Sequence, residues 1–88
     1  MFIYLVERTD EISEDEYDSF VVVCKNMDDA VNTHPSPSSG FEPGEYKWDK
    51  PYSPLEGWTY YRTRVKVTLI GRALTNKPEI ICASFNRG

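Results

Sequence analysis

Residues 20–24 read Phe-Val-Val-Val-Cys, and this run decides the fold. It is continuously apolar and too short for a typical helix, so it predicts a strand in the middle of a sheet. Residues 2–7, FIYLVE, alternate and are rich in aromatic and β-branched side chains, which predicts a second strand. The connection between these two runs has a length that suits an antiparallel pair.

The residues after this run predict one short helix. Asn26 is a typical N-cap, and Asp28 and Asp29 follow in the first turn, where carboxylates stabilise the positive end of the helix dipole. We expect the helix to span 27–34 and to end at Pro35, because the residue before a proline avoids the α region. Its apolar stripe would consist of Met27, Ala30 and Val31.

Residues 35–57 form a loop that is rich in proline, glycine and aromatic residues. A loop of this length is uncommon in a small domain, and a disordered linker would not usually carry so many aromatic rings. We therefore expect an ordered loop whose rings either pack on the sheet or face a partner. The candidate contact rings in and next to this loop are Tyr46, Trp48, Tyr52 and Trp58.

The C-terminal part predicts two more strands, over 58–70 and 79–85, joined by a turn region over 71–78. The chain therefore reads β-β-α-loop-β-β. This order predicts a single α+β domain over 1–88, with a four-stranded, mainly antiparallel sheet and one short helix. The third strand could pair beside either of the first two.

The connection between the first two strands, residues 9–18, is called the acidic hook here, because six of its ten residues are carboxylates. It could be a solvated turn that protects a sheet edge, an anionic surface for a basic partner, or a metal site. Calcium is disfavoured, because the segment lacks the spacing and the glycine of an EF-hand loop. The candidate partner-binding carboxylates are Asp10, Glu11, Glu14, Asp15, Glu16 and Asp18.

The predicted third strand carries a basic and aromatic face, which suggests single-stranded nucleic acid as an alternative partner. Its candidate residues are Tyr60, Arg62, Arg64 and Lys66. Trp58 is also an even-numbered position, so it would lie on the same face of the strand. The same face could equally be solvated or form cross-strand ion pairs. The chain has a net charge of −4, which weakens its attraction to a polyanion.

Catalytic and cofactor signatures are missing from the sequence. The single histidine, His34, would sit at the end of the predicted helix, and Cys24 and Cys82 lie in apolar runs that favour buried thiols. We therefore expect no enzyme activity, no cofactor and no bound metal. Apolar stretches are too short to span a membrane, and no signal peptide is predicted.

Both ends of the chain carry familiar motifs. YLVERTD at 4–10, EYDSFVVV at 16–23 and ICASFNRG at 81–88 resemble short proteins encoded by tailed phages and prophages. The resemblance implies an accessory protein in the cytoplasm of the bacterial host, and it carries no functional residue with it. We therefore expect a non-catalytic protein that binds, and possibly inhibits, a host or phage protein; its oligomeric state is left open.

Overall fold

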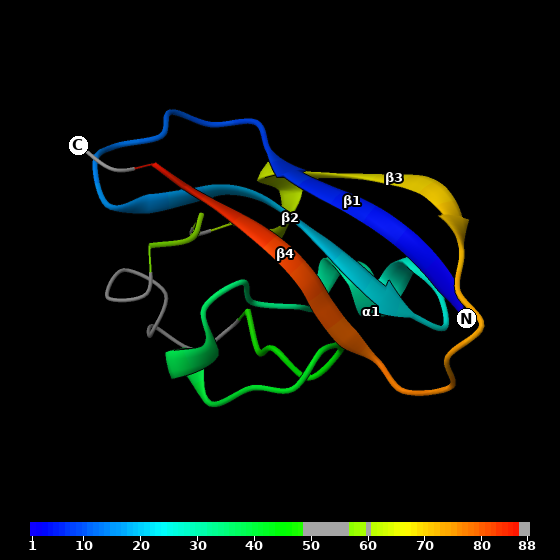
Figure 1. Cartoon of the computed structure of the whole chain (residues 1–88). Coiled ribbons are helices and arrows are strands. Elements are labelled where there is room, and N and C mark those ends of the chain that lie inside the picture. The colour runs from blue at the N-terminus through cyan, green and yellow to red at the C-terminus, as the bar shows by residue number, and fades with distance from the viewer. Residues whose placement is uncertain (49–56, 60, 87–88) are drawn as a thin grey trace.

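The computed structural model describes residues 1–48, 57–59 and 61–86. Within these residues, four strands form one antiparallel sheet in the order β3-β1-β2-β4 (Figure 1). The strands are β1 (Phe2–Arg8), β2 (Glu16–Cys24), β3 (Val65–Arg72) and β4 (Glu79–Asn86). One helix, α1 (Met27–Val31), and two short 3₁₀ turns, η1 (Pro37–Ser39) and η3 (Arg62–Arg64), complete the described elements. The predicted α+β fold class is confirmed.

The central position of the apolar run is also confirmed, because β2 lies between β1 and β4. Strand β3 pairs with β1, which settles the alternative that the sequence left open. Tyr4 and Val6 of β1 lie opposite Val22 and Phe20 of β2, and all four side chains are buried in one core. This covered face of the sheet packs against α1, whose Ala30 is fully buried.

The helix is shorter than predicted. Asn26 caps its N-terminus as expected, with its side-chain oxygen accepting the Asp29 N–H at 2.8 Å. It ends at Val31 rather than at His34. The Thr33 hydroxyl donates to the Asp29 carbonyl at 2.6 Å, which is the carbonyl that the Thr33 N–H would bond if the helix continued. The Trp48 indole donates to the Val31 carbonyl at 3.3 Å, and the Tyr46 N–H donates to the carbonyl of the next residue at 3.0 Å. Met27, expected in the apolar stripe, is half exposed.

The predicted strand over 58–70 begins only at Val65. Arg62–Arg64 instead form the 3₁₀ turn η3, in which the Arg64 N–H donates to the Tyr61 carbonyl at 3.0 Å. The Thr9 N–H donates to the Arg64 carbonyl at 2.7 Å, so this turn is held against the start of the acidic hook. Arg64 thereby lies beside hook carboxylates, and Lys66 lies opposite Glu7 of β1.

Candidate functional site

The acidic hook is folded around one buried cation, Arg8 at the end of β1. Its side chain is 3% exposed, and its Nε donates to Asp10 Oδ1 at 2.7 Å. Nη2 donates to the other Asp10 oxygen at 3.0 Å, and Nη1 lies 3.6 Å from Glu16 Oε1. A planar guanidinium can engage a carboxylate through two parallel bonds, which fixes both position and orientation. Arg8 therefore neutralises part of the hook from inside.

Arg8 also holds the backbone of the hook. Its Nη2 donates to the Glu11 carbonyl at 3.1 Å and its Nη1 to the Tyr17 carbonyl at 3.3 Å. On its other side the guanidinium lies 5.9 Å from the centre of the Trp58 ring. Because the same side chain contacts both ends of the hook, the hook has a defined shape rather than that of a loose solvated turn.

Asp10 lies between Arg8 and the 57–59 segment. The Thr59 hydroxyl donates to Asp10 Oδ2 at 2.8 Å. Partial burial alone would raise the pKa of the Asp10 carboxyl, but hydrogen bonds from Arg8 and Thr59 and the charge of Arg8 outweigh it. The pKa of Asp10 is therefore lowered, and the carboxylate stays ionised within this network.

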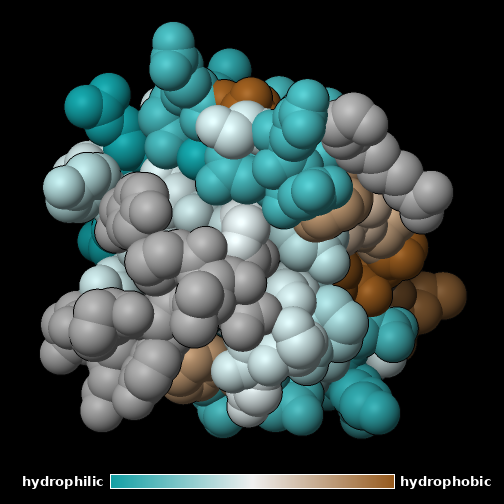
Figure 2. All heavy atoms as spheres, turned by 90° about the vertical axis from the view of Figure 1, so that its left-hand side faces the viewer, coloured by the Kyte–Doolittle hydropathy of each residue, from teal (hydrophilic) through white to brown (hydrophobic). Residues whose placement is uncertain are grey.

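The six predicted hook carboxylates thus divide into two groups. Asp10 and Glu16 face inward to Arg8, and the Ser13 N–H donates to Glu16 at 2.8 Å. Glu11, Glu14 and Asp15 are exposed, whereas Asp18 is half-buried and accepts from the Ser19 hydroxyl. Figure 2 shows hydrophilic residues along the top of the molecule, where the hook lies in Figure 1. Only the exposed group can offer its charge to a partner.

Three of the four candidate aromatic rings lie in or against the core. Tyr46 and Trp58 are buried, and Trp48 packs against the same cluster. The Trp58 ring packs edge-to-face on Phe20 at 5.3 Å, and Tyr46 packs in the same way on Trp48 at 5.0 Å. These rings therefore build the covered side of the sheet. The fourth candidate, Tyr52, lies outside the described residues.

The nucleic-acid alternative loses most of its predicted face. Arg62 and Arg64 lie on η3 and not on a strand, so only Lys66 follows the expected alternation. Trp58 is buried and cannot stack on a base, and Tyr60 lies outside the described residues. Arg62 is exposed and lies 3.7 Å from Asp28. The described residues therefore form no surface that combines basic side chains with the predicted stacking rings.

The histidine and the two cysteines depart in part from the sequence prediction. His34 is buried beyond the end of α1, where its Nδ1 accepts the Ser36 N–H at 3.0 Å. Burial raises the pKa of the Cys24 thiol, which makes it a poor nucleophile. Cys82, predicted to be buried, is exposed, because β4 is an edge strand. Among the described residues, no group of three or more His, Cys, Asp or Glu side chains could hold a metal ion.

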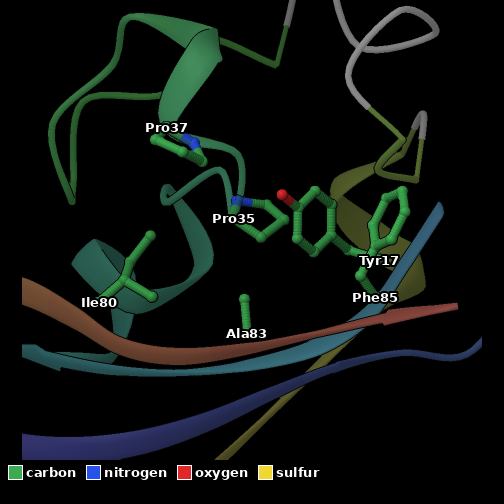
Figure 3. A pocket seen from close by; sticks show the side chains of 6 residues that line it. All are labelled: Tyr17, Pro35, Pro37, Ile80, Ala83 and Phe85. Atoms are coloured by element: carbon green, nitrogen blue, oxygen red, sulfur yellow. The ribbon is translucent and has the colours of Figure 1, made fainter. Parts of the chain in front are cut away.

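An apolar groove that sequence reasoning missed opens between β4 and the segment after α1. It has a volume of about 500 Å³. Figure 3 shows two proline rings on one side and side chains of β4 on the other, with an aromatic pair at one end. The lining residues are Tyr17, Pro35, Pro37, Ile80, Ala83 and Phe85. The pairing of two segments distant in sequence creates the groove, so no local motif signals it.

One end of the groove adjoins the acidic hook. Tyr17 follows the hook residue Glu16 and packs against Phe85 at 4.8 Å, closing one end of the groove. The Asp15 N–H donates to the Asn86 carbonyl at 2.7 Å, and the Asn86 amide donates to the Ser13 carbonyl at 3.0 Å. The exposed carboxylate of Asp15 therefore belongs to the residue that bonds Asn86, next to the groove residue Phe85 on the free edge of the sheet.

No protein-family model, curated protein or solved structure matches this chain. Among the residues that the structure describes, no helix has the length and apolar character needed to cross a membrane.

Proposed function

We propose that this chain is a small non-catalytic binding module for a segment of a partner protein. The observation that carries the proposal is the junction of the apolar groove with the exposed carboxylates of the acidic hook. Apolar pockets with a few fixed polar groups at their rim are the usual form of a specific binding site. The resemblance to short phage proteins supports a host or phage protein as the partner.

The chemistry of the surface defines the partner segment. An aliphatic or aromatic side chain fills the groove between Pro35 and Ile80, and a lysine or arginine beside it reaches Glu11, Glu14 or Asp15. The apolar contact supplies most of the affinity, whereas the charges set orientation and association rate. Because Arg8 fixes the backbone of the hook, the carboxylates are held in place before the partner arrives.

A pair of charge-reversal variants tests the electrostatic part. In the first, Glu11→Lys and Glu14→Lys replace two exposed hook side chains; Arg8 bonds the main-chain carbonyl of Glu11, which the substitution keeps. In the matched control, Glu42→Lys and Glu45→Lys change the net charge equally on the exposed 41–48 segment. Tagged protein is used to capture partners from bacterial lysate treated with nuclease, at low and moderate salt. We expect a captured protein to be lost with the hook variant and retained with the control.

A groove variant tests the apolar part. Phe85→Lys places a charge at the mouth of the groove, at a position that is already 42% exposed, so the fold should tolerate it. Capture of the same protein should fall strongly, and it should stay weak at high salt. If both the hook and the groove variants capture partners as well as the unmodified chain, this surface is not the binding site. Recovery of nucleic acid that nuclease removes would instead support the basic residues of η3 and β3.

A further inference from the structure

The face of the sheet that points away from α1 is apolar at its centre. Its central side chains are Ile3, Leu5, Val21, Val23 and Cys82, called the open face here. Leu5 lies directly opposite Val21, and Ile3 opposite Val23, with Cys82 beside Val21 on β4. None of the five belongs to the core cluster on the covered face, and of the five only Val23 is buried. In Figures 1 and 3, α1 and residues 33–40 lie on the other side of the sheet.

This arrangement is unusual for a sheet with one solvated face. Such sheets normally alternate between apolar residues on the covered face and polar residues on the solvated face. Here β1 and β2 carry apolar side chains on both faces over their central residues. A contiguous apolar surface of this kind on a folded domain marks an interaction site.

Charged residues lie at two ends of the apolar centre, as they do at the rim of protein interfaces. Glu7 and Lys66 lie opposite each other on β1 and β3 at the end of the sheet nearest the hook. Glu79 lies on β4 at the other end, opposite Val23. Lys66 and Glu79 therefore occupy diagonal corners of the open face and carry opposite charges.

We propose that the open face is covered by a second copy of this chain. The placement of the charges points to this occupant, because a face with opposite charges at diagonal corners is complementary to itself. Consider a two-fold axis that lies between the two faces, passes midway between Leu5 and Val21 and runs along the diagonal that does not contain Lys66 and Glu79. About this axis the strands of the two copies cross near a right angle, and each Lys66 meets Glu79 of the second copy. Crossed sheets of this kind are an established packing class, and two-fold dimers are the commonest oligomers.

The dimer is independent of the proposed partner surface. The groove lies on the covered side of β4, and its lining includes Pro35 and Pro37 from the segment on that side. Packing of the open faces therefore leaves both grooves and both hooks exposed. A dimer would present two equivalent binding surfaces, which strengthens binding to a partner that is itself repeated.

Sedimentation equilibrium over a wide range of concentration tests the proposal with the full chain. We expect a reversible dimer for the unmodified protein. Val21→Lys should weaken dimerisation by about tenfold or more, because it buries an unpaired charge in the interface. Cys82→Lys is a second variant at an exposed position, so its fold does not depend on the native side chain. Leu74→Lys, at a fully exposed residue between β3 and β4, is the matched control and should dimerise normally.

A charge exchange tests the crossed arrangement. Lys66→Glu should weaken the dimer by about two- to fivefold at low salt, as expected for an exposed ion pair. Combining it with Glu79→Lys should restore the original affinity. A monomer at every concentration, or a dimer that keeps its affinity in both Val21→Lys and Cys82→Lys, overturns the proposal. A dimer that the open-face variants weaken but the charge exchange does not restore overturns the crossed geometry.

Discussion

The acidic hook and the aromatic loop both suggest binding surfaces in the sequence, yet they have opposite roles in the structure. The hook exposes three carboxylates while its backbone is held by the buried Arg8. The described part of the loop turns its rings inward and covers the sheet with Tyr46 and Trp58. Charge predicts exposure for the three hook carboxylates that lack a buried partner, because unpaired ions resist burial. Aromatic content is a poor guide to exposure, because the same rings serve cores and interfaces.

The largest expected effect on the free energy of unfolding comes from the buried aromatic ring of Trp58. Trp58→Ala removes a ring that is 1% exposed and packs on both Phe20 and the Arg8 guanidinium. We expect a loss of about 3–5 kcal/mol in the free energy of unfolding, as for other buried large-to-small changes. Urea denaturation followed by circular dichroism measures it, with Leu74→Ala as an exposed control. A loss below about 1 kcal/mol would mean that the Trp58 ring is not part of the core.

The next largest effect concerns the cation within the hook. Arg8→Met keeps an unbranched apolar stem but removes the guanidinium that contacts Asp10, Glu16 and two backbone carbonyls. We expect a loss of about 3 kcal/mol, typical of breaking a buried ion pair from one side. Amide hydrogen exchange should accelerate in the hook and stay unchanged in α1.

An exposed ion pair provides the control for that variant. Arg62→Met removes the pair with Asp28, in which both side chains are more than half exposed. Its effect on stability should stay within about 0.5 kcal/mol. If the two arginine variants have equal effects, Arg8 does not hold the hook.

What the sequence predicts well is local. The Asn26 cap depends on neighbours within three residues, and the central strand follows from a single apolar run. The buried Arg8 was missed because its partners include the Thr59-bound Asp10 and the Tyr17 carbonyl, which only the folded chain brings together. The exposure of Cys82 depends on strand order, and neither hydrophobicity nor alternation determines which strand lies at an edge.

The candidate site was half predictable for the same reason. The exposed carboxylates at 11, 14 and 15 were anticipated from composition. The groove was not, because it requires Tyr17 of β2, two prolines after α1 and three side chains of β4 to meet. A proline-containing loop carries no sign of the strand against which it will pack.

Substitutions at two glycines test how closely the end of the 35–57 loop contacts the acidic hook. Gly57 has a φ of +70°, and a Cβ there would lie 3.0 Å from the Asp15 carbonyl oxygen of the hook. Gly40 has a φ of +80°, but a Cβ there would meet no heavy atom of the described residues within 4 Å. Gly40→Ala should therefore cost only the conformational penalty of about 1 kcal/mol. Gly57→Ala should cost about 1 kcal/mol more, because a backbone atom must shift. Equal losses in urea denaturation would show that the two segments are not in close contact.

The smallest expected effect is the pH dependence of the hook. The pKa of Asp10 is lowered in the folded chain, so the unfolded chain takes up its proton first as the pH falls. The stabilisation from Asp10 is therefore complete above its ordinary pKa of about 4 and is lost as the pH falls through the lower folded value. In urea denaturations at a series of pH values, Asp10→Asn should make the acid limb, the decrease of the free energy of unfolding at low pH, less steep. Thr59→Val removes one hydrogen-bond donor to Asp10 and should reduce the steepness in part. If Asp10→Asn leaves the acid limb as steep as before, other carboxylates govern acid unfolding, and the Arg8 network fixes the shape of the hook without setting its pH dependence.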